Sequence, residues 1–389
     1  MSMSATRGPH SMQKSPPAKV PRHFGQIFIM TATDDLRAGA AAGKQARYDD
    51  APMDRRAMIR TLGALGLALP ACRRRAPEAT PSASASPSAS ASVPGSGSVT
   101  GSGSGAPYPQ AAPKELLAND ELALHDWALP GDPKIARRAV VLVPRHLAKG
   151  ERVPLLVLLH GLAETASEEM GAYAWVRRYG VAEGYAHLRA PSTITMEGLG
   201  KMATEARIGE LQQALAIKPF RGMVIACPYT PNIWKVQPDV QATLDVYAQW
   251  IFEVLVPRLR SETPCLVADA HTGLDGVSLG GHASLGVGAR RAGELGSIGC
   301  VQAAIAAVDA ETWTDRFDKA FKKSGPRPLH LLTSTMDVFR KPVEAFDAAL
   351  TKRGIAHDFR LAIGPHDQPF LRGPGSLEML LWHARALDG

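Results

Sequence analysis

Short apolar runs and amphipathic segments alternate along the chain from about residue 139 onward. Apolar runs of strand length cover residues 139–144, 154–159, 223–227, 272–277, 328–333 and 357–363, and also 298–306, whose alanines would equally suit a helix. Segments with the helical spacing of apolar positions cover residues 240–256, 279–295, 343–353 and 379–387. Alternation of this kind predicts an α/β fold, with a mostly parallel sheet flanked by helices on both faces.

The first 108 residues carry a different pattern. Residues 1–52 are polar without a sustained period, and we expect them to be disordered. Residues 53–72 combine a basic start, a short apolar run and a small residue before Cys72, which is the pattern of an export signal. Residues 73–108 are a linker of Ser, Ala, Gly and Pro. Because such signals work at an N-terminus, we expect translation to start at Met53 and residues 1–52 to be an over-called upstream extension.

The end of the export signal resembles a bacterial lipobox, in which a diacylglyceryl group is attached to the cysteine. It reads Leu-Pro-Ala-Cys, and Pro70 departs from the small or aliphatic residue usual at its position. Arg55 and Arg56, followed by apolar residues, resemble a twin-arginine signal. These resemblances imply an exported protein held at the cell envelope, on the periplasmic or outer-surface side, by a lipid on Cys72. The alternative is a cytoplasmic amphipathic helix with an incidental cysteine.

The basic excess of the chain lies in this leader. The 389 residues include 44 Lys and Arg and 37 Asp and Glu; 13 and 6 of these fall in residues 1–108, which leaves 31 of each sign in residues 109–389. The predicted globular domain is formally neutral, so its charge gives no indication of a nucleic-acid partner.

The remaining cysteines indicate neither a metal site nor a redox site. Cys227, Cys265 and Cys300 lie in or beside apolar runs and have no C-x-x-C spacing. We expect buried free thiols, while a single disulfide stays open for an exported domain.

Residues 276–280 read Gly-Val-Ser-Leu-Gly and lie between a predicted strand and a predicted helix. This G-x-S-x-G pattern is typical of a nucleophile elbow, a strained strand-to-helix turn that exposes the serine. The two glycines let strand and helix approach each other closely. Ser278 is therefore the candidate nucleophile, and the alternative is an ordinary serine in a glycine-rich surface turn.

A serine hydroxyl needs a base, and the base needs a carboxylate that orients it. Behind a nucleophile elbow the chain order is serine, acid, histidine. Asp337 follows the penultimate predicted strand and His366 follows the last one, so they are the candidate acid and base. Asp309 follows the preceding strand and is the reserve candidate for the acid. Asp367 is expected to point away from the site.

Two further histidines, His330 and His357, lie within predicted strands. We expect both to be satisfied interior residues without a catalytic role.

Residues 276–285, Gly-Val-Ser-Leu-Gly-Gly-His-Ala-Ser-Leu, resemble the elbow of the esterase D and feruloyl-esterase-like α/β-hydrolases, which commonly reads G-x-S-M-G-G-H-x-x-L. Leu279 replaces the methionine. The resemblance spans about residues 135–387 and is specific at three short motifs: the elbow, the strand that runs into His160-Gly161, and the acid-histidine pair. It implies an oxyanion hole made by the backbone amides of Leu162 and Leu279, with no cofactor and no metal. We expect His160 to orient its loop.

Residues 161–220 are longer than the single helix usual at this connection, so we expect a cap-like insertion near the active site. The insertion carries four aromatic residues close together: Tyr173, Trp175, Tyr179 and Tyr185. They would form an apolar acyl pocket or a sugar-stacking platform, or else the core of a small cap. Trp234 would border the same cleft.

The sequence thus predicts an exported serine esterase with a catalytic domain at residues 109–389. Its expected substrate is a small-molecule or polysaccharide-linked ester, hydrolysed through an acyl-enzyme, and its only membrane contact is the lipid anchor. The alternatives are an acyltransferase or peptidase on the same fold, or a catalytically idle glycan-binding module. The ester, the acyl length and the oligomeric state stay open.

Overall fold

The computed structural model describes residues 116–236 and 239–388. The predicted leader, Cys72 and the linker lie outside the described residues, as do residues 109–115 of the predicted catalytic domain. Within the described residues, no helix has the length and apolar character that crossing a membrane requires.

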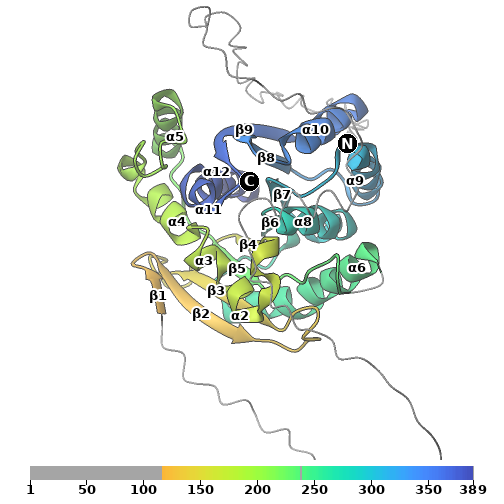
Figure 1. Ribbon diagram of the computed structural model, residues 1–389. Helices are drawn as coiled ribbons and strands as arrows, with labels where there is room; N and C mark the ends of the chain where they lie inside the picture. Colours follow the sequence, from red (N-terminus) through yellow and green to blue (C-terminus); the bar gives the residue numbers. More distant parts are fainter. Residues whose placement is uncertain (1–115, 237–238, 389) are drawn as a thin grey trace, which may run out of the picture. The chain divides into compact units, whose positions relative to one another are not determined.

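A nine-stranded sheet runs through the described domain in the order β1-β2-β3-β5-β4-β6-β7-β8-β9 (Figure 1). Its strands are β1 (Leu116–Asn119), β2 (Leu122–Ala128), β3 (Arg138–Pro144), β4 (Leu155–Leu159), β5 (Val224–Pro228), β6 (Thr272–Gly276), β7 (Ser297–Val301), β8 (Leu329–Met336) and β9 (Asp358–Pro365). The pairs β1–β2, β2–β3 and β3–β5 are antiparallel. The remaining pairs, β5–β4, β4–β6, β6–β7, β7–β8 and β8–β9, are parallel. The predicted mostly parallel sheet is confirmed.

Helices cover both faces of this sheet (Figure 1). The α-helices are α2 (Glu168–Ala172), α3 (Ala174–Arg177), α4 (Val181–Arg189), α5 (Glu205–Ile217), α6 (Val240–Trp250), α7 (Val256–Glu262), α8 (Leu279–Arg290), α9 (Ala310–Ser324), α10 (Arg340–Arg353), α11 (Gln368–Phe370) and α12 (Ser376–Leu387). A π-helical turn, η3 (Ile251–Leu255), joins α6 to α7, so the helix predicted over 240–256 continues to residue 262. The short turns η1 (Leu162–Ala166) and η6 (Ala307–Asp309) follow β4 and β7.

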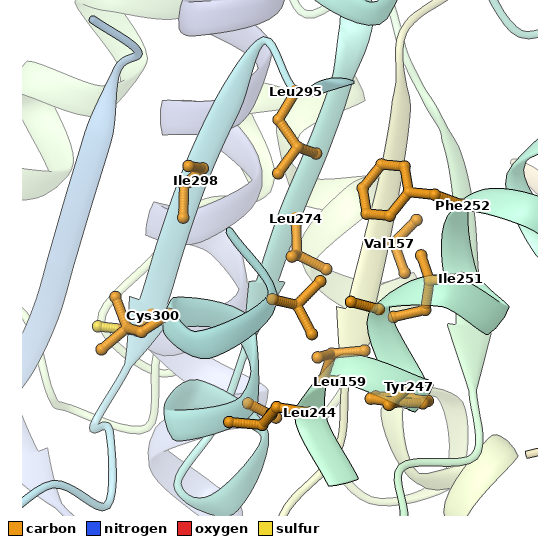
Figure 2. Close-up of a cluster of buried hydrophobic side chains, with 14 of the residues drawn as sticks. Val157, Leu159, Leu244, Tyr247, Ile251, Phe252, Leu274, Leu295, Ile298 and Cys300 are labelled. Carbon is orange, nitrogen blue, oxygen red and sulfur yellow. The ribbon is translucent and has the colours of Figure 1, made fainter. Parts of the chain in front are cut away.

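One hydrophobic core lies between the sheet and α6, α8, α9 and α10. Figure 2 shows Leu244, Tyr247 and Ile251 facing β4, β6 and β7 across this core. All three side chains have 0% exposed surface, which confirms the amphipathic face predicted for this helix. Burying large apolar side chains of this kind stabilises a fold by about 1.5–3 kcal/mol each.

A second core lies on the opposite face, under α3, α4 and α12. The four aromatic residues of the insertion belong to it, with exposed fractions of 0–5%. The aromatics therefore do not form an open stacking platform. Of the expected alternatives, the core of a cap agrees best with the structure, although these aromatic side chains also pack with residues of the sheet.

The run predicted as a strand over 298–306 stops at Val301, where β7 ends. Gln302 then adopts a φ of +48°, a left-handed conformation that a side chain other than glycine rarely takes, and the chain leaves the sheet. The alanine-rich remainder forms a loop rather than more strand or a helix.

The three cysteines of the described domain are free and buried, as expected. Burial raises the thiol pKa of Cys227, Cys265 and Cys300, so these side chains behave as small apolar groups.

Candidate active site

The turn between β6 and α8 holds Ser278 in a strained backbone conformation. Its φ is 57° and its ψ is −114°, and only 9% of the residue is exposed. A Cβ on Gly276 would lie 2.3 Å from the carbonyl oxygen of Gly280, and one on Gly280 would lie 2.2 Å from that of Leu159. Both flanking positions therefore require glycine, as a nucleophile elbow does.

Backbone hydrogen bonds fix the elbow to the end of β7. The amide of Ser278 donates to the carbonyl of Val301 at 3.0 Å, and the amide of Ala304 donates back to the carbonyl of Ser278 at 2.9 Å. The serine thus sits at the carboxyl edge of the parallel strands, between β4 and β7, with the α8 N-terminus immediately after it. The strand order and the strained elbow together identify the fold.

The chain has the α/β-hydrolase fold. In the numbering of this fold β2 is the first strand and β9 the last, and β1 is an addition at the sheet edge. Ligand sites of open parallel sheets lie beyond the carboxyl ends of their strands, and the candidate residues gather at this edge.

The acid and the histidine predicted from the sequence are joined by a hydrogen bond. Nδ1 of His366 lies 2.7 Å from Oδ1 of Asp337; because a carboxylate only accepts, the ring donates there, and Nε2 is left as the acceptor. Oδ1 of Asp337 also accepts the amide of Phe339 at 2.9 Å, and Oδ2 accepts the hydroxyl of Thr333 at 2.6 Å. The Phe339 ring packs edge-on against the imidazole at 5.4 Å. The ring and carboxylate are therefore oriented from both sides.

In the described part of the chain, the Ser278 side chain forms no hydrogen bond with His366. Gln302, which follows Val301 at the end of β7, connects the segments that carry these two residues. The Gln302 amide Nε2 donates to the carbonyl of Pro365 at 2.8 Å, directly before His366, and also contacts the hydroxyl of Ser334 at 2.7 Å. The fully buried Gln302 side chain thus links the acid strand to the histidine loop, and the residue before it, Val301, accepts the amide of Ser278.

The two amides assigned to the oxyanion hole lie on either side of the elbow. Leu279 is the first residue of α8, and the first amides of a helix have no partner within it, so they bind anionic groups readily. Leu162 begins η1 after β4. A Cβ built on the preceding Gly161 would lie 3.8 Å from the Cβ of Ser278, which places this loop against the nucleophile.

His160 fixes the direction of the Leu162 amide. Its Nε2 accepts the amide of Thr230 at 2.8 Å, so its proton is on Nδ1, which donates to the carbonyl of Gly161 at 2.9 Å. In a trans peptide the following N–H points the opposite way from that carbonyl. Burial lowers the pKa of His160 to about 4, so the ring stays neutral and keeps this arrangement near neutral pH. The geometry agrees with the orienting role expected for His160.

The other candidates lie apart from this group. Asp309 ends η6 and is exposed. The Asp367 side chain caps α11 by accepting the amide of Phe370 at 2.9 Å, and so points elsewhere. His330 is buried, as expected, and stacks on Trp382, but the expectation that it is satisfied is wrong, because its Nδ1 has no hydrogen-bond partner in the described residues.

Two smaller predictions concern the surroundings of the site. His357 is partly buried and pairs with Asp347 at 2.7 Å. Trp234 packs edge-on against His282 of α8 at 6.0 Å. Across residues 116–236 and 239–388, no three His, Cys, Asp or Glu side chains gather as a metal site would require.

The sequence analysis missed several residues that shape this site. Thr333 and Phe339 lie four residues before and two residues after Asp337, a local signal that was available. Gln302 carries no such signal, because its role depends on contacts between distant segments.

No family model matches the chain, and no curated protein matches it. Among solved structures, the chain is similar to an S-formylglutathione hydrolase from Staphylococcus aureus, with 14% identity over 68% of this chain and 99% of that one, and a TM-score of 0.48. It is also similar to a ferulic acid esterase, with 16% identity, 68% and 99% coverage and a TM-score of 0.49. An S-formylglutathione hydrolase from Agrobacterium tumefaciens matches with 14% identity, 68% and 95% coverage and a TM-score of 0.43.

Proposed function

We propose that this protein is a serine esterase that hydrolyses carboxylic esters through an acyl-enzyme. The observation that carries the proposal is the 2.7 Å hydrogen bond between Asp337 and His366, at the same sheet edge as the strained Ser278. A base that is oriented by a buried carboxylate, at the same sheet edge as an elbow serine, is an arrangement suited to activating a hydroxyl.

In the first half-reaction Oγ of Ser278 attacks the ester carbonyl carbon, and its proton passes to Nε2 of His366. Asp337 keeps the ring oriented and stabilises the imidazolium that forms. The carbonyl oxygen, now negative, is bound by the amides of Leu162 and Leu279. The tetrahedral intermediate collapses, the alkoxide leaves with the proton from Nε2, and the acyl group remains on Ser278.

In the second half-reaction water takes the place of the alcohol. His366 accepts a proton from this water, whose oxygen attacks the acyl carbon, and the same two amides bind the second oxyanion. Collapse releases the carboxylic acid and returns the proton to Oγ of Ser278. No group other than these residues and water is needed to balance the reaction.

A fluorophosphonate probe tests the proposal directly, because it labels only an activated serine. We expect labelling at Ser278, together with release of p-nitrophenol from p-nitrophenyl esters; a series of acyl lengths then defines the pocket. An excess of acceptor sugar separates a hydrolase, which yields only acid, from a transferase, which yields a new ester. Absence of both labelling and turnover would leave the idle binding module.

We also propose that the enzyme is exported and held at the cell envelope by a lipid on Cys72. The support is the sequence pattern of residues 53–72 and the linker of residues 73–108 that follows. Such a linker would let the catalytic domain work at a distance from the membrane surface.

A further inference from the structure

The loop that carries the Leu162 amide is held on its other side by a tyrosine of the insertion. The hydroxyl of Tyr179 accepts the amide of Gly161 at 3.3 Å and donates to Oε2 of Glu164. His160 holds the carbonyl of the same glycine. Both backbone polar groups of Gly161 therefore have a fixed side-chain partner, one residue before the oxyanion amide.

Gly161 lies between the nucleophile and this tyrosine. A Cβ built on Gly161 would lie 3.0 Å from the Tyr179 hydroxyl, 3.3 Å from Oε2 of Glu164 and 3.8 Å from the Cβ of Ser278. The glycine thus transmits the position of Tyr179 and Glu164 to the immediate surroundings of Ser278.

Glu164 sets the direction of the tyrosine hydroxyl. It is only 2% exposed, and a buried carboxylate is costly unless it is paired and hydrogen-bonded. Oε1 accepts a hydrogen bond from the Arg178 guanidinium at 3.3 Å, and Oε2 accepts one from the hydroxyl of Tyr179. Because a carboxylate only accepts, the tyrosine must donate to it, which leaves an oxygen lone pair for the Gly161 amide.

Tyr179 is itself rigidly placed. Its ring packs edge-on against Trp175 at 5.1 Å, and its carbonyl accepts the hydroxyl of Ser376 in α12 at 2.8 Å. Burial and the neighbouring Glu164 raise the pKa of Tyr179 well above its usual 10, so the hydroxyl keeps its proton.

We propose that Tyr179 and Glu164 are positioning residues that hold the Gly161-Leu162 loop so that the Leu162 amide faces the oxyanion. This inference rests on the proposed esterase function. It gives the aromatic-rich insertion a role that is neither a pocket nor a platform: it is buried in the core and supports the oxyanion hole through one hydroxyl.

The first test compares Tyr179→Phe with Tyr173→Phe. Tyr173 is a matched control, since it is a buried tyrosine of the same insertion whose hydroxyl also donates to an arginine-paired carboxylate, Asp126, at 3.0 Å. Loss of a whole oxyanion donor lowers kcat about 100- to 1,000-fold, so a misaligned donor should lower it by roughly 10- to 100-fold in Tyr179→Phe, with KM nearly unchanged. Tyr173→Phe should keep kcat within about twofold.

The second test separates geometry from charge at Glu164. Glu164→Gln keeps an oxygen that can accept the tyrosine proton, whereas Glu164→Ala removes it. We expect the glutamine variant to retain most of the wild-type kcat, and the alanine variant to lose as much as Tyr179→Phe. Inhibition by a trifluoromethyl ketone, whose adduct places an oxyanion in the hole, should weaken in parallel with kcat. Equal losses in the glutamine and alanine variants would contradict a positioning role.

Hydrogen exchange of the peptide around Gly161 gives a readout that needs no catalysis. Exchange at this loop should be faster in Tyr179→Phe than in the wild type, and unchanged in Tyr173→Phe. The inference is overturned if exchange does not change, or if kcat falls no further than in the control. If the wild type hydrolyses no ester, the proposed function fails by itself; faster exchange then still supports the loop-holding contact, and unchanged exchange refutes it.

Discussion

His366 donates its Nδ1 proton to Oδ1 of Asp337 over 2.7 Å, and the Asp337 side chain is completely shielded from solvent. Three donors converge on this carboxylate, since Phe339 and Thr333 bind it as well. The imidazole therefore has one available orientation and one tautomer, with Nε2 as its free acceptor. That relationship sets the first prediction.

Asp337→Asn should lower kcat by about four orders of magnitude, because an amide can donate to Nδ1 and then favours the wrong tautomer. Asp309→Asn is the control: Asp309 ends η6 in an exposed position, so its variant should be nearly normal. Steady-state hydrolysis of a p-nitrophenyl ester measures both. The reverse pattern would move the acid to Asp309 and leave Ser278 and His366 in place.

Ser278→Ala should lower kcat by about six orders of magnitude and abolish fluorophosphonate labelling, since triad members act as a unit. The fold should persist, because the Ser278 side chain forms no hydrogen bond in the described part of the chain. We expect the variant to unfold at the same temperature as the wild type and to take up no fluorophosphonate label. Retention of more than about a tenth of the wild-type rate would remove Ser278 from the mechanism.

The sheet and the elbow were predictable because their signals are local. Buried strands leave continuous apolar runs, and the elbow leaves two glycines around a serine. α9 was not predicted, although its buried residues Trp313 and Phe317 recur at helical spacing. The helix was therefore predictable from the sequence.

The support of the site was not predictable in the same way. Gln302 binds the carbonyl of Pro365, 63 positions later, and only the closed fold brings them together. Tyr179 was noticed as an aromatic, but burial is a tertiary property, so the sequence could not distinguish a pocket from a core. The catalytic roles of Ser278, Asp337 and His366 stay predictions until they are measured.

Gly276→Ala should prevent the elbow from forming, because the new Cβ would lie 2.3 Å from the carbonyl oxygen of Gly280, a backbone atom that cannot move aside. Gly209→Ala is the matched control: it lies in α5 with no atom within 4 Å of a Cβ, and should stabilise the protein by about 0.5–1 kcal/mol. Urea unfolding and esterase activity measure both variants. A fully active, stable Gly276→Ala protein would contradict the elbow geometry.

Cys72→Ser should release the protein from the membrane fraction. A diacylglyceryl group with an N-acyl chain exceeds the single chain that anchors only marginally, so the wild type should stay bound. Metabolic labelling with an alkyne fatty acid checks the modification, and fractionation checks the location. The segment from Ala106 onward should keep full activity, because every candidate catalytic residue lies beyond it. A wild type without label in the soluble fraction would rule out the lipid anchor.

Three histidines with lowered pKa values, the buried His160 and His330 and the partly buried His282, should make the protein sensitive to mild acid. Burial lowers the pKa of His160 and His282 to about 4 and that of His330 to about 3, against about 6.5 in an unfolded chain. At a pH between the folded-state and unfolded-state pKa values, the unfolded chain binds more protons than the folded one. The free energy of unfolding is therefore unaffected by these histidines above about pH 6.5 and falls as the pH drops toward 4. At about 1.4 kcal/mol per pKa unit, each such shift lowers the free energy of unfolding by a few kcal/mol once the pH has dropped below the pKa of the folded state.

His330→Phe isolates this effect at one position. In the described residues Nδ1 of His330 has no hydrogen-bond partner, and the ring stacks on Trp382 at 4.7 Å, so phenylalanine should keep the packing without the titratable group. Urea unfolding at about pH 7 and about pH 4.5 should show a smaller loss of stability in this variant than in the wild type. The raised pKa of the buried Asp275 acts in the opposite direction, but it is present in both proteins and cancels in the comparison. Equal losses in the two proteins would show that His330 is not held neutral by burial.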